Sequence, residues 1–326
     1  MTPVVVASPA RSARSFARLR AEGLLPEGVQ DVALDDDGRP EAGGEGATVL
    51  WARRDDAWGR WFDGALDRLP ELRWLHVDTV GIDYLPIGRL VERGILLTNG
   101  SGNFARPMAE WVLLAMLAAA KRLPWFVRRS DAGTWDPTPT LRELDGTVAL
   151  LLGFGATNRL VAELAAPFGV EVRAAVRRPR ERIPDGVAKL VVGDDWRKEL
   201  PDADWVVLGL PATDHTRGMI DAGALAAMRQ GAWLVNVARG ALVDEDALVA
   251  ALDAGRLGGA VLDAFTTEPL PQASPLWGRD NVVVVPHHTW SSPASYRRME
   301  DLFAAQLSRW SRGEPMHNVI DPQTGY

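Results

Sequence analysis

The chain has 326 residues, which is enough for two domains. Hydrophobic residues make up 47% and charged residues 24%, as in an ordinary globular protein, and the net charge of −7 argues against nucleic acid or an anionic membrane as a partner. The lack of cysteine excludes disulfides, thiolate-bound metals and a cysteine nucleophile. The first residues do not form a signal peptide, and the apolar stretch 111–120 is too short to span a bilayer, so we expect a cytoplasmic protein.

The first third of the chain alternates between apolar runs and helical periodicities. The apolar runs at 4–7, 48–51, 72–77 and 95–98 predict strands, and the periodicities at 14–20, 58–69 and 85–93 predict helices. Residues 35–37, 40–46 and 99–103 are typical of loops. We expect Pro107 at the first position of a helix that continues to Ala120, because its missing N–H costs nothing there. The segment 122–144, rich in Trp, Pro and Asp, is expected to be irregular.

A second alternating series follows. Strands are expected at 148–152, 170–176, 205–209, 233–237, 259–264 and 282–285, with helical runs between them. A last helix is expected over 292–312, because Pro293 stands at its start and Gly313 just beyond its end. Such alternation predicts parallel sheets, and the two series predict an α/β protein of two domains.

The segment 146–158 has the order strand, glycine turn, helix. Gly153 and Gly155 match the first two glycines of the G-x-G-x-x-G motif, in which one makes the tight turn and one lets the backbone approach a pyrophosphate. Asn158 stands where the third glycine is usual. An ordinary turn is the alternative, but the strands around the motif favour a dinucleotide site. The expected cofactor contacts are Gly153, Phe154, Gly155, Ala156, Thr157 and Asn158.

The end of the following strand bears on the choice of dinucleotide. An NAD site usually has Asp or Glu there to bind the ribose 2′-hydroxyl, whereas this strand ends Val176-Arg177-Arg178. Guanidinium groups pair well with phosphate. We therefore expect Arg177 and Arg178 to favour NADP(H), with NAD(H) as the alternative cofactor and a solvated basic turn as the competing interpretation.

Three functional side chains follow three expected strands of the second series. Arg239, Glu268 and His287 each come after an apolar run, and binding sites form at the carboxyl ends of parallel strands. A cation, a carboxylate and an imidazole at one edge suit proton transfer at an anionic substrate. Histidine suits reversible proton transfer because its ordinary pKa is about 6.5. This set predicts an oxidoreductase acting on a small 2-keto or 2-hydroxy acid.

From Leu72 onward the chain resembles the D-isomer-specific 2-hydroxyacid dehydrogenases. The resemblance is carried by Val80-Gly81-Ile-Asp83, Leu234-Val-Asn-Val-Ala-Arg239-Gly-Ala-Leu-Val-Asp-Glu, Asp263-Ala-Phe-Thr-Thr-Glu268-Pro-Leu-Pro and Asn281-Val-Val-Val-Val-Pro-His287. It implies that His287 is the acid/base, that Glu268 pairs with it, and that Arg239 binds the substrate carboxylate and carbonyl.

The resemblance also implies further contacts in both domains. The substrate's carboxylate end would meet Val80, Gly81 and the Asn99 loop, and Asp263 would meet the nicotinamide carboxamide. The remaining residues expected along the cofactor are Leu210, Pro211, Thr216, Val237, Ala238, Arg239 and His287.

The expected architecture is a Rossmann-type doubly wound sheet for the cofactor and a flavodoxin-like substrate domain. The substrate domain would comprise 1–101 and 291–326, and the dinucleotide-binding domain 102–290. The segment 123–144 resembles the arm through which these enzymes form homodimers, with a surface loop as the alternative interpretation.

The chain departs from the family pattern at Thr157, at Asn158 and at the residues after the catalytic histidine. His288-Thr289-Trp290 replaces small and aliphatic residues there, so we expect Trp290 to reshape the substrate pocket. No metal is expected, since cysteine ligands and the H-x-x-x-H spacing are absent. The other histidines, His76, His215, His288 and His317, are left without a role.

Three other functions compete with the dehydrogenase. A dehydrogenase-like regulator could bind the dinucleotide without significant turnover, and turnover of glyoxylate, hydroxypyruvate or pyruvate would exclude it. A methyltransferase would require an acid at the end of the second strand, where this chain has arginine. Formate dehydrogenase is disfavoured because Glu268 is retained.

Overall fold

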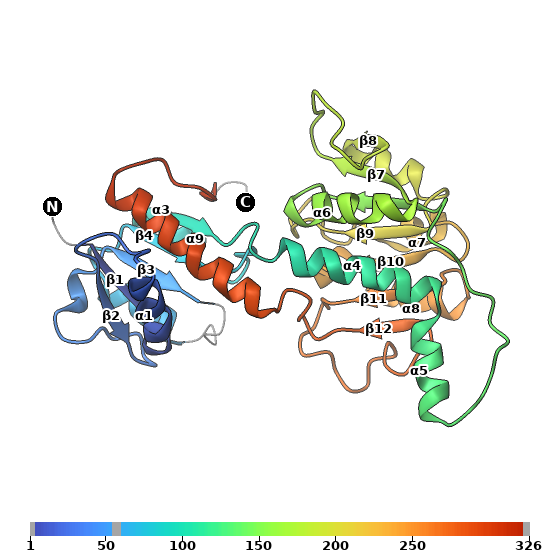
Figure 1. Ribbon diagram of the computed structural model, residues 1–326, viewed down its shortest axis with the longest axis horizontal. Helices are drawn as coiled ribbons and strands as arrows, with labels where there is room; N and C mark the ends of the chain where they lie inside the picture. Colours follow the sequence, from blue (N-terminus) through green and yellow to red (C-terminus); the bar gives the residue numbers. More distant parts are fainter. Residues whose placement is uncertain (1–3, 54–59, 322–326) are drawn as a thin grey trace. The chain divides into compact units, whose positions relative to one another are not determined.

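The computed structural model describes residues 4–53 and 60–321, which fold into two units. Unit 1 is formed by Met1–Asn103 with Ser292–Tyr326, and unit 2 by Phe104–Ser291 (Figure 1). Both are α/β, and within the described residues each contains one parallel sheet. The α/β fold with parallel sheets predicted from the alternating pattern is therefore confirmed. No helix in this part of the chain combines the length and apolar character needed to cross a membrane.

Unit 1 has five described strands in the order β2-β1-β3-β4-β5, the flavodoxin-like order. The strands are β1 (Val5–Pro9), β2 (Gln30–Leu34), β3 (Val49–Ala52), β4 (Trp74–Val77) and β5 (Leu96–Asn99). The helices are α1 (Ala13–Ala21), α2 (Arg60–Arg68), α3 (Ile87–Glu92) and α9 (Pro293–Ser311), with short 3-10 turns η1 (Ala10–Ser12) and η2 (Gly44–Gly46). The start of the helix expected over 58–69, including Trp58, lies outside the described residues.

Apolar cores lie on both faces of this sheet. Side chains of α2 and α3 form one core, and those of α1 and α9 form the other. The last helix belongs here because its apolar residues are buried against strands far away in sequence. Phe303 of α9 stacks on Trp51 of β3, with ring centroids 4.1 Å apart. Burial of such large rings stabilises this arrangement.

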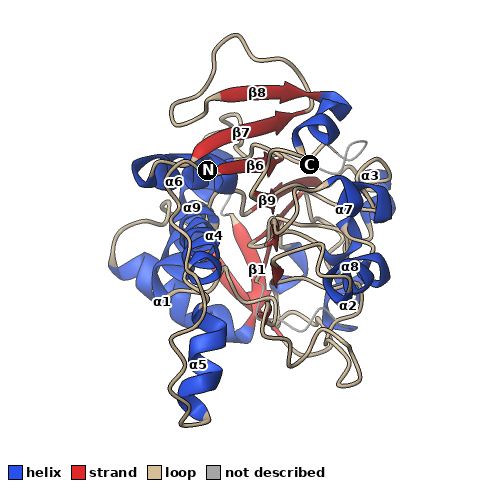
Figure 2. Ribbon diagram, turned by 90° about the vertical axis from the view of Figure 1, so that its right-hand side faces the viewer, coloured by secondary structure: helices blue, strands red, loops and turns tan. Residues whose placement is uncertain are grey.

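Unit 2 has seven described strands in the order β12-β11-β10-β9-β6-β7-β8. They are β6 (Val148–Leu152), β7 (Glu171–Val176), β8 (Lys189–Val192), β9 (Trp205–Leu208), β10 (Trp233–Asn236), β11 (Gly259–Leu262) and β12 (Val282–Val284). Figure 2 shows β8, β7, β6 and β9 in succession. Numbered from β6, the strands follow the Rossmann order with a seventh strand added. The order in which the chain adds strands to the sheet reverses between β6 and β9.

The helices of unit 2 cover both faces of its sheet. They are α4 (Ala105–Ala120), α5 (Leu123–Asp131), α6 (Ala156–Ala165), α7 (Ala222–Ala227) and α8 (Glu245–Asp253). Short 3-10 helices are η3 (Ala166–Phe168), η4 (Gly193–Glu199) and η5 (Gly240–Leu242). One core includes apolar residues of α4 and α6, and the other those of α7 and α8. The predicted doubly wound arrangement is thereby confirmed.

Two details of the prediction were wrong. The helix expected to begin at Pro107 begins at Ala105, so the proline is its third residue. A proline is tolerated there as well, because none of the first four N–H groups of a helix has an intrahelical partner. The segment 122–144 is irregular only after α5, which contains Pro124 in its first turn and no buried residue.

Candidate active site

The parallel sheet of unit 2 places three chemically distinct side chains at one edge. β10, β11 and β12 are neighbours, and Arg239, Glu268 and His287 follow their respective carboxyl ends. All three belong to unit 2. The site is therefore assembled by strands that are adjacent in space but separated in the sequence by helix α8 and loops.

The turn that carries Arg239 is fixed by a neighbour. Asn236, the last residue of β10, accepts a hydrogen bond from the Ala238 N–H at 3.0 Å and donates one to the Arg239 carbonyl at 2.9 Å. Asparagine favours such local bonds to the backbone. At Gly240 the chain lies so close to the Phe265 carbonyl that a Cβ atom would collide with it. The turn thus holds the Arg239 segment against the loop that leads to Glu268.

Glu268 and His287 form a hydrogen-bonded pair. His287 Nδ1 lies 2.8 Å from Glu268 Oε2, while Glu268 Oε1 accepts from the Phe265 N–H at 3.0 Å. Partial burial alone would raise the pKa of the Glu268 carboxyl. The bonds from His287 and Phe265, with the charges of His287 and Arg239, instead hold that pKa below its usual value. Glu268 is thus a carboxylate at neutral pH, and it engages the Nδ1 side of the His287 ring.

The loop after β12 is held by Asp263. This buried carboxylate accepts from the His288 N–H at 2.7 Å, from the Thr289 N–H at 3.2 Å and from the Thr289 hydroxyl. Burial raises the pKa of Asp263, against the opposing effect of these bonds. The resemblance implied a contact with the nicotinamide for this residue. The structure shows that its carboxylate binds the backbone next to His287.

The glycine turn lies at the carboxyl end of β6, beside the point where the strand order reverses. Gly153 has a φ of 82°, and a Cβ there would lie 2.7 Å from Cβ of Leu210. Gly155 precedes α6, and a Cβ there would meet nothing within 4 Å. The backbone at Gly155 is therefore accessible, and it lies next to the first turn of α6, whose N–H groups have no partner within the helix. These features fit the pyrophosphate of a dinucleotide.

Asn158 occupies the place of the third glycine without opening the turn. Its amide nitrogen donates to the Gly153 carbonyl at 2.7 Å and to the Leu152 carbonyl at 3.3 Å, and the side chain is fully buried. Space for it comes from Gly209 at the end of β9, where a Cβ would lie 2.5 Å from the Asn158 amide nitrogen. The departure is accommodated by a glycine on the neighbouring strand. Ala156 and Thr157 complete the first turn of α6.

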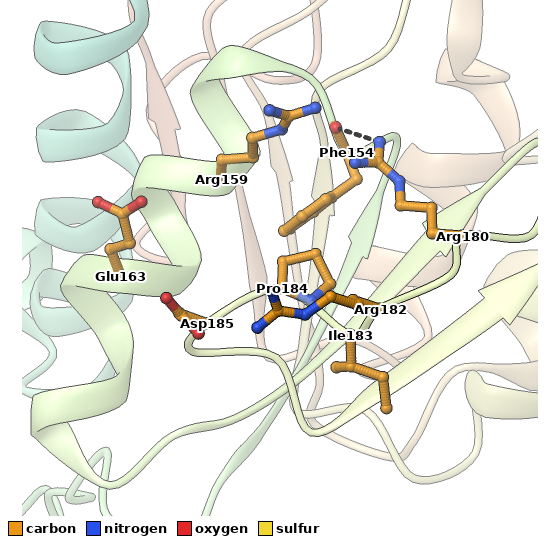
Figure 3. A pocket seen from close by; sticks show the side chains of 8 residues that line it. All are labelled: Phe154, Arg159, Glu163, Arg180, Arg182, Ile183, Pro184 and Asp185. Carbon is orange, nitrogen blue, oxygen red and sulfur yellow. Dashed lines mark hydrogen bonds between the residues drawn. The ribbon is translucent and has the colours of Figure 1, made fainter.

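The loop after β7 carries more arginines than the two expected at the cofactor. Arg177 and Arg178 are exposed directly after the strand. Arg180 donates to the Phe154 carbonyl at 3.2 Å and lies over the Phe154 ring, 5.4 Å from its centroid. Figure 3 shows Arg159, Arg180 and Arg182 around a cavity of about 390 Å³ beside Phe154. Glu163 and Asp185 also line this pocket, so arginines outnumber carboxylates by one in the pocket beside the glycine turn.

The other residues expected along the cofactor lie after β9 and β10. The Thr216 hydroxyl donates to the Pro211 carbonyl at 2.7 Å and accepts from the Thr213 N–H at 2.8 Å, which closes the turn after Leu210. Val237 is buried and Ala238 half-buried, directly after β10. The sheet order places both segments on the side of β6 away from β7.

The residues expected to meet the substrate carboxylate lie together in unit 1. Asn99 ends β5, and its amide nitrogen donates to the Val80 carbonyl at 2.7 Å. Its oxygen accepts from the Ser101 N–H at 3.1 Å. The half-exposed Gly81 follows Val80 in the loop after β4, so the two loops form one backbone surface. The other two residues predicted to bind substrate, Arg239 and Trp290, lie in unit 2, and Trp290 is 7% exposed.

The structure shows where the four histidines lie to which the sequence analysis gave no role. His76 is fully buried and its Nδ1 lies 2.8 Å from the Thr98 hydroxyl, and burial lowers its pKa to about 3. The His288 ring packs against Trp290. His215 and His317 are exposed. No group of three or more acidic or histidine side chains within 4–53 and 60–321 is arranged to hold a metal ion.

Sequence reasoning missed three residues that shape the site. Asn236 orders the Arg239 turn, Thr289 binds Asp263, and Arg180 reaches the glycine turn. A signal was available for Asn236, because an asparagine just before a turn commonly bonds to the backbone two residues further on. The contacts of Thr289 and Arg180 depend on loops that meet only in the folded chain.

The fold and the site together define a dinucleotide-binding α/β protein with an imidazole–carboxylate pair. Residues 113–289 match the model of the D-isomer-specific 2-hydroxyacid dehydrogenase NAD-binding domain. The chain belongs to this family. It is an oxidoreductase that transfers hydride between a nicotinamide dinucleotide and a small 2-keto or 2-hydroxy acid.

Relatives of known name have similar sequences and folds. Glyoxylate/hydroxypyruvate reductase A of Klebsiella pneumoniae subsp. pneumoniae is 33% identical over 279 residues, 83% of this chain and 80% of that protein. D-3-phosphoglycerate dehydrogenase of Methanocaldococcus jannaschii is 30% identical over 78% of this chain, which spans only 49% of that protein's length. A D-isomer-specific 2-hydroxyacid dehydrogenase of Xanthobacter autotrophicus Py2, solved with NADPH and MES, has a TM-score of 0.85 at 30% identity, with both chains fully covered.

Proposed function

We propose that the protein reduces small 2-keto acids with His287 as the proton donor. The observation that carries this assignment is the 2.8 Å hydrogen bond between His287 Nδ1 and a Glu268 carboxylate whose pKa is held low. Glu268 follows β11, the neighbour of the strand β10 that precedes Arg239, and His287 follows β12, the next strand of the sheet. NADPH oxidation measured against glyoxylate, hydroxypyruvate and pyruvate tests the proposal. If none of these acids is turned over, the proposed substrate class is wrong.

The side chains divide the work of the reaction. The reduced nicotinamide supplies the hydride. Protonated His287 donates a proton from Nε2 to the carbonyl oxygen and accepts it in the reverse direction, while Glu268 favours the charged imidazole. Arg239 binds the substrate carboxylate and stabilises negative charge on the carbonyl oxygen. The loops of Val80, Gly81 and Asn99 provide backbone contacts for the carboxylate end.

The pH dependence of reduction tests the role of Glu268. Because its pKa lies below the usual value, Glu268 is a carboxylate throughout the neutral and alkaline range. Glu268→Gln removes the negative charge that favours the imidazolium. We expect the alkaline limb of the kcat/KM profile to move to lower pH. An unchanged limb, measured by NADPH oxidation from pH 5 to 9, would contradict the pairing.

The cofactor is proposed to be NADP(H) in preference to NAD(H). Support comes from the exposed Arg177 and Arg178 after β7, from the basic pocket beside Phe154, and from the lack of an acidic residue at the strand end.

The substrate domain is proposed to be 1–101 with 291–326 and the dinucleotide domain 102–290. The family model of an NAD-binding domain covers most of the second range.

Cofactor preference can be measured directly by fluorescence titration. We expect NADPH to bind about tenfold or more tightly than NADH, since a charge-assisted contact contributes about 1.5–3 kcal/mol. Arg177→Ala/Arg178→Ala should weaken NADPH much more than NADH, and high salt should narrow the difference. Arg14→Ala/Arg20→Ala, a change of equal charge at two exposed positions of α1, serves as the control. Equal affinities of the original protein for the two cofactors would refute the proposal.

A homodimer is proposed through the arm near 123–144. An apolar cavity of about 460 Å³ lies among α4, α5 and β12, and its lining includes Leu114, Leu123, Val127 and Trp277, each more than 40% exposed. Figures 1 and 2 show α5 projecting beside this region. Beyond α5, Trp135 is 94% exposed. Exposed apolar patches of this kind mark protein–protein contacts, and the resemblance makes a second copy the expected occupant.

Light scattering at micromolar concentration tests this assembly. We expect a mass of two chains for the original protein and of one chain for Leu123→Glu/Val127→Glu, because burying two carboxylates in an apolar interface is costly. Arg106→Glu, at an exposed position in the first turn of α4, is the control and should remain dimeric. A monomeric original protein would contradict the proposal.

The remaining parts of the proposal concern the binding partners of the protein and its cellular location. The partner is proposed to be a small 2-keto or 2-hydroxy acid, not nucleic acid or a membrane, because the net charge is −7. A cytoplasmic location is proposed as well, which the lack of cysteine fits.

A further inference from the structure

The residue at 290 is a tryptophan that contacts the backbone of His287. Its ring is 7% exposed, and its indole nitrogen donates to the His287 carbonyl at 3.0 Å. A buried indole N–H needs an acceptor, and this one uses a carbonyl of the residue proposed as the acid/base. The contact joins the third residue after the histidine to the histidine itself, which makes the loop a closed turn.

His287 has a backbone conformation that its surroundings must maintain. Its φ of 51° lies in the left-handed region, which is unfavourable for residues with a Cβ atom. The His287 N–H donates to the Val285 carbonyl at 2.9 Å, and Asp263 binds the two residues that follow. Trp290 contributes the bond to the carbonyl. Such a conformation persists where several contacts determine it together.

The Trp290 ring is itself held in place. It meets the Phe104 ring edge to face, with centroids 5.4 Å apart and planes at 77°, and the His288 ring at 5.6 Å and 72°. Phe104 is 3% exposed and precedes the first residue of α4. Phe104 and Trp290 lie at the two ends of unit 2, where the chain enters it and is about to leave it. The carbonyl of His287 is thereby fixed to the start of a long buried helix.

We infer that Trp290 is a positioning residue for proton transfer, which holds His287 so that Nδ1 stays on Glu268 and Nε2 remains directed to the substrate. The inference rests on the proposed role of His287. It assigns Trp290 an action through the imidazole, whereas the resemblance suggested only a change in the substrate pocket. The residue therefore influences the rate and the pH dependence of reduction and leaves dinucleotide binding unaffected.

The variant Trp290→Phe keeps a large ring against Phe104 and removes the indole donor. We expect kcat for glyoxylate to fall about three- to tenfold, the effect of one hydrogen bond, with the Kd for NADPH unchanged. The alkaline limb of the pH profile should move to lower pH, in the same direction as in Glu268→Gln. The matched control is Trp205→Phe, which also removes a hydrogen bond of a buried indole nitrogen, here to the Thr147 hydroxyl at 3.0 Å. Trp205 begins β9, so it lies at the opposite end of the strands from the candidate site. It should lower Tm without moving the pH profile.

A double variant distinguishes positioning from general loss of stability. If Trp290 acts by keeping His287 on Glu268, the effect of Trp290→Phe should shrink in a Glu268→Gln background. Should Trp290→Phe fold poorly, Phe104→Leu loosens the same ring and should produce a smaller shift in the same direction. Unchanged kcat and pH profile in these variants would overturn the inference while leaving the role of His287 intact. Near-normal turnover in His287→Ala would instead overturn the proposed function, and the inference with it.

Discussion

Replacement of His287 by alanine is expected to lower kcat for 2-keto acid reduction by about 10²–10⁴-fold, the usual contribution of a positioned general acid. The imidazole is bound to Glu268 through Nδ1 and is the proposed proton donor, so its removal deletes that donor. NADPH binding should change little, because the glycine turn at Gly153 and Gly155 and the loop after β7 lie at other strands of the sheet. Steady-state NADPH oxidation and fluorescence titration measure the two quantities.

The control for this change is His317→Ala, since that histidine is exposed in unit 1. It should retain full turnover. If His287→Ala lost NADPH binding together with turnover, the imidazole would be supporting the fold of the site, and the assignment as proton donor would fail. Addition of free imidazole provides a further check, because a small base that enters the vacated space restores part of the rate only when the proton transfer itself was lost.

Most of the strands that sequence patterns located are buried; β12, at an edge of its sheet and only partly buried, was located because its residues are all valine. Runs such as 148–152 are apolar throughout because β6 lies in the middle of its sheet and is covered on both faces. β2 and β8 escaped prediction because each is an edge strand with exposed residues, so that neither needs a continuous apolar run. α5 was missed for a related reason, since none of its residues is buried and its apolar side lies at the surface.

In the candidate site, too, some features could be predicted from the sequence and others depend on contacts made only in the folded chain. The order Arg239, Glu268, His287 could be placed at strand ends from the sequence, because a parallel sheet brings carboxyl ends to one edge. The left-handed conformation of His287 could not, because it depends on contacts of Asp263 and Trp290 that are made only in the folded loop. The same holds for Asn158, whose buried side chain is accommodated by Gly209 on a strand about fifty residues later.

Replacement of Arg239 by alanine should affect both substrate binding and the chemical step. Arg239 follows β10 on a turn fixed by Asn236, and its charge contributes to the low pKa of Glu268. Loss of a charge-assisted contact worth about 1.5–3 kcal/mol should raise KM for the keto acid about 10- to 100-fold. Loss of a donor at the developing oxyanion should lower kcat by a further factor of about 10²–10³. Steady-state kinetics with varied glyoxylate separates the two effects.

Arg239→Lys distinguishes charge from geometry. Lysine keeps the positive charge but lacks the planar fork that can bind a carboxylate and a carbonyl oxygen together, so it should recover part of the KM and little of kcat. The Kd for NADPH and the Tm of both variants should stay close to those of the original protein, because the Arg239 turn is held by Asn236 through backbone atoms. A kcat that is unchanged in Arg239→Ala would show that the arginine binds substrate and transition state equally, and its proposed role at the carbonyl oxygen would then be wrong.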